Sequence, residues 1–417
     1  MMNIEEKKVW MKRYAELLVK FGVNIQRGQK LVFALPHEAR EFGLHVVEAA
    51  YEAGSGHVFM YYFDHEIFHI QQQKAQIEVL KEGDNTIEKA LGRLIDEGAA
   101  VLFLVGAHPE AMPADTTDQR KNAFLKTFMN SFSEIQNRRR SQITNSCLPF
   151  FPTLEYSAYL FPDLEPSDAQ LRLMEMLTPI FKLDKENPVA VWHEHISKLK
   201  TRANLLNSYA FDSLHFSGGE TDLMIGLVKD HIWCSAFGTT ENGVDCAFNF
   251  PSEELFTAPD WRRAEGSISS TRETFTLGFM IDKVRFDVQK GKIIKEETDG
   301  DLALLKKLLN QDAQSRYLGE VALVSEDSPI ASQPMSFKNL LFDENAGSHI
   351  AFGSAYPHCI HSGASMTKEE LLNAGMNVSE QHIDLIIGSR ELLVTGITAE
   401  GKEVEIMTNG LWAGEFR

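Results

Sequence analysis

The sequence lacks the features of a disulfide-stabilised or membrane-spanning protein. It has four cysteines in 417 residues and no CxxC pair, so the cysteines do not describe a disulfide framework. Its longest apolar runs, such as residues 101–105, fall far short of the roughly 20 residues that cross a bilayer. The first residues include no apolar signal segment either. We therefore expect a cytoplasmic protein with no membrane partner.

Basic residues are too few for a nucleic-acid-binding protein. The chain has 41 Lys and Arg against 59 Asp and Glu, a formal net charge of −18 at pH 7. A chain of this charge repels phosphate backbones and anionic membrane surfaces, so we expect no nucleic acid partner. The hydrophobic content of 43% and the charged content of 24% are those of an ordinary globular protein. A chain of this length predicts two domains.

Several common catalytic motifs are missing. No P-loop is present, and no GxGxxG follows the first expected strand, which excludes the usual nucleotide sites. His193 and His195 flank a glutamate, but a zincin helix needs its second histidine at position 197, which is Ser197. We therefore expect these two histidines to lie on exposed helix faces.

Residues 1–185 predict an α/β N-terminal domain. Helical spacing of apolar residues at 5–21 and 41–53 alternates with short apolar runs at 30–35, 57–62 and 99–105. Strands separated by helices favour a mainly parallel sheet with helical crossovers.

Residues 186–417 predict an α+β C-terminal domain that carries the active site. After a helical region that ends near 208, short strands separated by turn residues are typical of antiparallel pairing. A helix near residues 300–310 interrupts them. We expect the domain boundary near 185. The predicted strands are 222–227, 231–235, 274–279, 284–288, 292–295, 320–324, 384–387, 392–398 and 403–408.

Carboxylates and imidazoles gather in four segments of this second domain. A rigid loop at 249–259 carries two glutamates, a third precedes an apolar strand, and the segment 342–357 adds a glutamate and a histidine. In the fourth segment, i,i+2 spacing on a strand sends His382 and Asp384 to the same face. Six such side chains suffice for two divalent ions that share a carboxylate, as in co-catalytic hydrolases. The candidates are Glu253 or Glu254, Glu320, Glu344, His349, His382 and Asp384.

At these residues the chain resembles the M29 family of metallo-aminopeptidases, the thermophilic-aminopeptidase type. The resemblance runs over nearly the whole length, in the family's order. The matching segments are 14–29, 218–223, 249–259, 343–351 and 377–388.

The resemblance implies a specific set of site residues. Glu320 would bridge two metal ions and take part in catalysis, and Tyr356 would hydrogen-bond the tetrahedral intermediate. Glu254 is preferred over Glu253 because the family's carboxylate directly precedes an apolar–Phe–Thr step. The metal ligands would be Glu254, Glu320, Glu344, His349, His382 and Asp384.

The implied activity is hydrolysis of the N-terminal peptide bond of short peptides with a free amine. Two divalent ions, Zn, Co, Mn or Mg, would hold a bridging water that attacks the carbonyl, with Glu254 or Glu320 moving the proton. Family members are homodimers, so a homodimer is expected. Two alternatives stay open: a metal-dependent amidohydrolase or deacylase of another amide, and a non-catalytic peptide- or metal-binding protein.

Overall fold

The computed structural model describes residues 2–82, 86–105, 120, 123, 135–136, 138–139, 142–276 and 279–417. Contacts divide the chain into two compact units, Met1–Glu194 with Ala236–Pro251, and His195–Ser235 with Ser252–Arg417. The first unit takes in residues 236–251, which two consecutive domains of 1–185 and 186–417 would assign to the second. Within the described ranges, no helix is long and apolar enough to cross a membrane.

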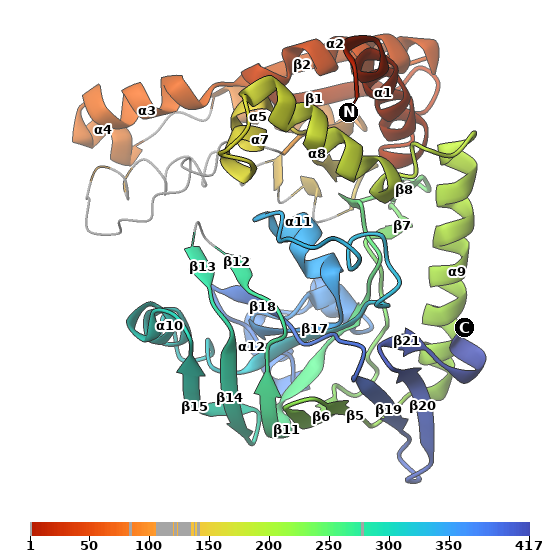
Figure 1. Ribbon diagram of the computed structural model, residues 1–417, viewed down its shortest axis with the longest axis vertical. Coiled ribbons are helices and arrows are strands. Elements are labelled where there is room, and N and C mark those ends of the chain that lie inside the picture. The colour runs from red at the N-terminus through yellow and green to blue at the C-terminus, as the bar shows by residue number, and fades with distance from the viewer. Residues whose placement is uncertain are drawn as a thin grey trace. The chain divides into compact units, whose positions relative to one another are not determined.

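The first unit contains a five-stranded sheet in the order β2-β1-β3-β4-β9, with every neighbouring pair parallel (Figure 1). The prediction of a parallel sheet with helical crossovers is confirmed. The inner strand β1 is buried along all but its first residue, which explains its continuous apolar run. The strands are β1 (Lys30–Pro36), β2 (His57–Phe63), β3 (Ala100–Phe103), β4 (Ser146–Pro149) and β9 (Asn249–Phe250), with a hairpin of β7 (Phe237–Thr239) and β8 (Asp245–Ala247).

Some helices of the first unit begin at residues whose side chains cap them. The side chain of Asn3 accepts hydrogen bonds at the start of α1, and Glu6 completes a capping box. Thr153 caps α7 in the same manner. The helices are α1 (Ile4–Leu17), the π-turn η1 (Leu18–Gly22), η2 (His37–Ala39), α2 (Arg40–Glu52), α3 (His65–Lys74), α4 (Ile77–Glu82), α5 (Thr86–Asp96), α7 (Leu154–Leu160), α8 (Pro166–Ile180) and α9 (Pro188–Tyr209), which continues into the second unit.

The second unit is built from antiparallel strands, as expected (Figure 1). An eight-stranded sheet has the order β15-β14-β11-β6-β5-β19-β20-β21, and a hairpin joins β12 to β13. Alternating burial along β14 shows that one face of this sheet packs inward. Its strands are β5 (Ser213–Gly218), β6 (Thr221–Leu227), β11 (Pro259–Ser269), β14 (Val284–Gln289), β15 (Lys292–Thr298), β19 (Leu393–Ile397), β20 (Glu403–Thr408) and β21 (Leu411–Trp412), and the hairpin is β12 (Thr274–Thr276) and β13 (Phe279–Ile281).

A smaller four-stranded sheet in the same unit has the order β10-β16-β17-β18. The strand predicted at 231–235 is wrong: those residues form only isolated bridges, His231 with Ile360 and Cys234 with Phe256. The elements are β10 (Leu255–Thr257), β16 (Leu318–Leu323), β17 (His349–Gly353) and β18 (His382–Ile386), with the helices α10 (Leu302–Leu309), α11 (Leu340–Asp343), η4 (Glu344–Ala346), η5 (Pro357–Cys359), η6 (Gly363–Ser365), α12 (Lys368–Ala374) and η7 (Gly414–Phe416).

Candidate metal centre

One face of the four-stranded sheet collects all the predicted ligands except Glu344, which lies in η4. Glu320 on β16 pairs with Ala351 on β17, and Ala351 pairs with Asp384 on β18. Directly paired residues of antiparallel strands point to the same side. The two carboxylates therefore lie on either side of the small Ala351 methyl group. Both are buried, with Glu320 4% and Asp384 2% exposed.

The two histidines reach the same face through the period of two along a strand. His349 lies two residues before Ala351, and His382 two residues before Asp384. Nε2 of His382 is 3.0 Å from a Glu320 oxygen and 3.2 Å from an Asp384 oxygen.

Main-chain carbonyls orient both imidazoles. Nδ1 of His349 lies 3.2 Å from the carbonyl oxygen of Gly347, and Nδ1 of His382 lies 2.8 Å from that of Ser354. Because a carbonyl oxygen can only accept, each Nδ1 must donate, and Nε2 is turned toward the carboxylates. Histidines that bind metal ions are commonly held in this manner.

Glu254 joins the cluster through β10. Phe256 pairs with Ala322, which pairs with His349, so Glu254, two residues before Phe256, projects to the same side. A Glu254 oxygen lies 3.4 Å from Nε2 of His349. The neighbouring Glu253 instead lies 3.3 Å from Nε2 of His195. The structure thus places Glu254, and not Glu253, beside His349.

The ligand atoms fall into two groups with one member in common. In each group the candidate atoms lie within 4.8 Å of one another, and Glu320 belongs to both. Glu344, at the start of η4, is in neither group. The two groups are Glu254, Glu320 and His349, and Glu320, His382 and Asp384.

Electrostatics show that the cluster holds a surplus of negative charge. Burial, together with the charge of Glu320, raises the pKa of Glu254 well above its usual range. Burial and the charge of Glu254 also raise the pKa of Glu344 well above its usual range. Burial opposes ionisation of Asp384, but the neighbouring His382 holds its pKa below the usual value.

Tyr356 stands at the rim of the same cluster. It directly precedes η5, its ring centroid is 5.0 Å from that of His382, and 41% of the residue is exposed. The charge of His382 lowers the pKa of the phenol, but desolvation of the hydroxyl group and the carboxylates of Glu320 and Asp384 outweigh it and raise the pKa overall. The phenol therefore stays protonated at neutral pH and can donate a hydrogen bond.

Two features near the predicted ligands, a β-bulge before Glu320 and the pairing of His195 with Glu253, were not predicted from the sequence. A register shift between Leu318 and Glu320 makes a β-bulge at Gly319, and a Cβ there would lie 2.2 Å from the carbonyl oxygen of Gly353. The bulge directly precedes Glu320. His195 also differs from expectation, because it is partly buried and paired with Glu253 rather than displayed on an exposed face, whereas His193 is exposed.

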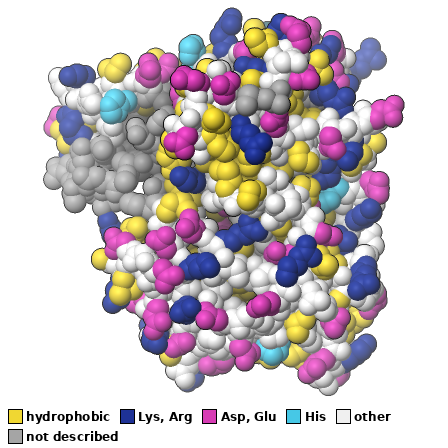
Figure 2. Space-filling model, in the orientation of Figure 1, with side chains coloured by type: hydrophobic (Ala, Val, Ile, Leu, Met, Phe, Trp, Pro, Cys, Tyr) yellow, Lys and Arg dark blue, Asp and Glu magenta, His cyan; other side chains and the backbone are white. Residues whose placement is uncertain are grey.

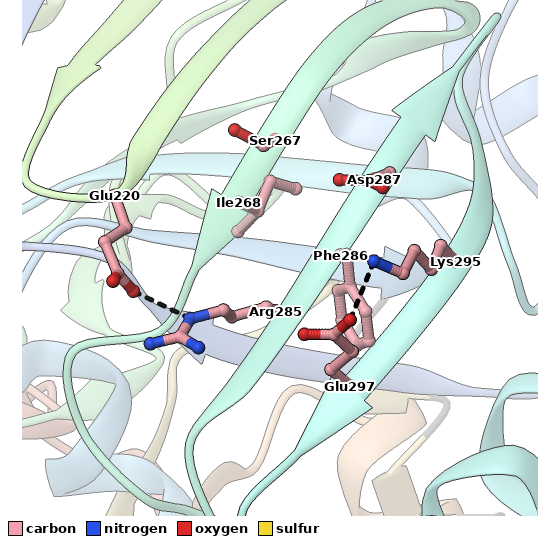
Figure 3. Close-up of a pocket in the computed structure, with 8 residues that line it drawn as sticks. All are labelled: Glu220, Ser267, Ile268, Arg285, Phe286, Asp287, Lys295 and Glu297. Carbon is pink, nitrogen blue, oxygen red and sulfur yellow. Dashed lines mark hydrogen bonds and ion pairs between the residues drawn. The ribbon is translucent and has the colours of Figure 1, made fainter.

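A surface hollow of about 340 Å³ lies elsewhere in the second unit, on the large sheet (Figure 3). Two ion pairs lie among its lining residues, Arg285 with Glu220 and Lys295 with Glu297, each at 2.7 Å. It includes none of the predicted ligands.

Acidic and basic side chains are interspersed over the face of the molecule seen in Figure 2, so the net negative charge of the chain is not gathered there into a single patch.

Comparison with known proteins gives the same family over the whole chain. Residues 7–412 match the family described as thermophilic metalloprotease (M29). Aminopeptidase AmpS from Bacillus subtilis is 33% identical over 400 residues, 96% of this chain and 97% of that protein. Aminopeptidase T from Thermus thermophilus is 32% identical over 405 residues, 96% of this chain and 98% of that protein.

Structural similarity agrees with the sequence matches. The structure of wild-type AmpT from Thermus thermophilus superposes with a TM-score of 0.88 at 31% identity, covering 98% of this chain and 100% of that one. The chain therefore belongs to the thermophilic metalloprotease (M29) family and is a metallo-aminopeptidase.

Proposed function

We propose that this metallo-aminopeptidase removes the N-terminal residue of short peptides with two divalent metal ions that share Glu320. The observation that carries the proposal is the membership of Glu320 in both ligand groups. A carboxylate has two oxygens, so one side chain can serve two ions. The proposed ligands are Glu254, Glu344 and His349 for one ion and His382 and Asp384 for the other, with Glu320 common to both.

The residues present fit such ions. Four carboxylates face only two imidazoles, and buried surplus charge of one sign is costly unless a proton or a cation compensates it. The raised pKa values of Glu254 and Glu344 express that cost. Mixed carboxylate and imidazole ligands accept Zn²⁺, Co²⁺ and Mn²⁺, and carboxylates also accept Mg²⁺.

The bound ions would supply Lewis-acid activation of the scissile carbonyl and an acidified water. Among the side chains, Tyr356 would donate its phenolic proton in a hydrogen bond to the developing oxyanion. Its raised pKa supports a donor that remains protonated through the reaction. Glu254 or Glu320 would accept the proton of the water and pass it to the leaving amine.

The function is tested with a chelated sample and paired substrates. We expect hydrolysis of an aminoacyl reporter amide to disappear in metal-stripped protein and to return with Co²⁺, Zn²⁺ or Mn²⁺. The same reporter with an acetylated N-terminus should not be cleaved, because the free amine is part of what is recognised. Cleavage of the blocked reporter at an equal rate would favour a deacylase. Bound metal without any turnover would favour a binding protein.

The homodimer and the cytoplasmic location are further proposals, and the homodimer rests on the family resemblance. Light scattering of the purified protein tests the first. Fractionation of the source cells tests the second. A monomeric mass across a range of protein concentrations would contradict the dimer.

A further inference from the structure

A third group of potential metal ligands lies in the second unit and contains sulfur. Cys234, His358 and Cys359 each offer a ligand atom, and the three atoms lie within 4.8 Å of one another. They share no member with the two carboxylate groups. His358 and Cys359 come from η5, and Cys234 comes from the irregular segment that bridges to β10.

Hydrogen bonds hold the main chain on both sides of this group. Cys234 exchanges main-chain hydrogen bonds with Phe256 at 2.8 and 3.0 Å. The amide of Ile232 donates to the carbonyl oxygen of Cys359 at 2.7 Å. The thiol of Cys234 contacts the carbonyl oxygens of Ile232 and His358 at 3.7 Å, and it hydrogen-bonds the thiol of Cys359. The two sulfur atoms are therefore neighbours on anchored backbone.

We propose that Cys234, His358 and Cys359 form a separate binding site for a soft d¹⁰ dication such as Zn²⁺ or Cd²⁺. Thiolate sulfur and imidazole nitrogen are the ligands these ions prefer. Zn–S bonds of about 2.3 Å place tetrahedral sulfur ligands about 3.8 Å apart, which lies within the observed limit. Three protein ligands leave the fourth position to water.

Charge balance favours a dication at this place. Each thiol releases its proton to solvent as it coordinates, so two thiolates neutralise one dication and no net charge is buried. Cys359 is 1% exposed and packs in an apolar cluster with Phe256 and Ile360, where an uncompensated charge would be costly.

The site is coupled to the candidate catalytic tyrosine. The amide of Cys359 donates to the carbonyl oxygen of Tyr356 at 2.9 Å, and the ring of His358 lies 5.6 Å from the ring of Tyr356. An ion that draws His358 and Cys359 together would therefore constrain the turn that carries Tyr356. We expect occupancy to lower turnover, and this consequence rests on the proposed function.

Binding is tested on the full-length protein loaded with Mn²⁺, a harder ion that leaves thiols free. Titration with Cd²⁺ should produce an ultraviolet thiolate-to-cadmium charge-transfer band that saturates at one Cd²⁺ per chain, while Mn²⁺ stays bound. Cys234→Ser and Cys359→Ser should lose the band. His358→Asn keeps both thiols and should shift the titration to higher Cd²⁺ concentration.

The other cysteine pair provides the matched control. Cys147 and Cys246 are buried neighbours in the first unit, and Cys246→Ser should keep the whole band. A band that survives in both Cys234→Ser and Cys359→Ser, or no band in the natural chain, would overturn the site. Circular dichroism identifies a variant that has failed to fold. If a cysteine variant has failed, the test is whether His358→Asn shifts the Cd²⁺ titration, and an unshifted titration would then overturn the site.

Turnover is measured in the same titration, relative to the cadmium-free rate of each variant. If turnover falls as the charge-transfer band grows, and does not fall in Cys234→Ser, the coupling to Tyr356 is supported. Loss of turnover accompanied by release of Mn²⁺ and no band would mean that Cd²⁺ enters the carboxylate centre, which contradicts the proposal. A saturating band on a protein with no aminopeptidase activity would refute the proposed function and leave the thiol site standing.

Discussion

The side-chain oxygen of Asn345 accepts a hydrogen bond from the main-chain N–H of Glu253 at 2.7 Å. This bond ties the loop that presents Glu254 to the turn η4 that presents Glu344. Asn345 is fully buried, and its amide nitrogen donates to the carbonyl oxygen of Leu341 at 3.2 Å. One neutral side chain thus connects the two segments that carry Glu254 and Glu344, and it adds no charge to the cluster.

Replacement of Asn345 by alanine should loosen both segments. The buried N–H of Glu253 would lose its partner, which typically costs about 1–3 kcal/mol. We expect a lower unfolding midpoint and weaker metal retention during dialysis. Thr153→Ala is the control, because Thr153 accepts from the amide of Tyr156 at 3.2 Å in the first unit, where no metal ligand is proposed. Equal metal retention in both variants would contradict the role given to Asn345.

Glu320→Ala should remove both ions, because Glu320 is the member that the two ligand groups share. Metal content per chain, measured after gel filtration, should fall from two to near zero. Glu344→Ala serves as the comparison, since Glu344 belongs to neither group, and it should lose no more than one ion. Retention of both ions in Glu320→Ala would refute the shared ligand.

Tyr356→Phe should reduce kcat about a hundredfold, the typical effect of removing one donor to an oxyanion. Metal content and KM should change little, because the ring and its packing against His382 remain. Tyr317→Phe is the control: its ring packs against Trp261 at 4.9 Å in the same unit, and it should keep full turnover. Unchanged kcat in Tyr356→Phe would remove the phenol from the chemistry.

The sequence was most informative where periodicity and burial coincide. The apolar run of β1 predicted a buried parallel strand, and the i,i+2 spacing of His382 and Asp384 predicted one face of a strand; both features are present. Periodicity failed for β11, whose exposed Arg262 and Arg263 hide its long pairing with β6 and β14. Pairing with neighbours, rather than local alternation, creates that strand.

The arrangement around the ligands could not be predicted from the chain alone. The cross-strand row of Glu320, Ala351 and Asp384 depends on a register that the bulge at Gly319 sets. The sequence Gly319-Glu320 does not by itself predict a bulge. The need for glycine becomes apparent only from the structure, where the carbonyl oxygen of Gly353 lies against Gly319. The pairing of Glu253 with His195 likewise joins residues that are distant in sequence.

Asp312 should give the protein part of its resistance to acid. Burial is the largest single influence and raises its pKa, but hydrogen bonds from the amide of Glu380, the hydroxyl of Ser379 and the amide of Gln314 together outweigh it and lower the pKa overall. A carboxyl whose folded pKa is depressed contributes stability that is complete above its unfolded pKa of about 3.9. That stability is lost as the pH falls through the lower, folded pKa. The carboxylate holds residues 379–380, which are separated from β18 only by Gln381.

Asp312→Asn removes this titration, so its urea midpoint should fall less steeply than that of the natural chain below pH 4. At pH 7 the variant should already be less stable, because the charged acceptor is gone. Ser379→Ala leaves the two amide donors in place and should keep an intermediate slope. Each midpoint is measured in metal-free protein, so that acid release of metal does not enter the comparison. Identical slopes in Asp312→Asn and the natural chain would show that the carboxylate of Asp312 does not link folding to pH.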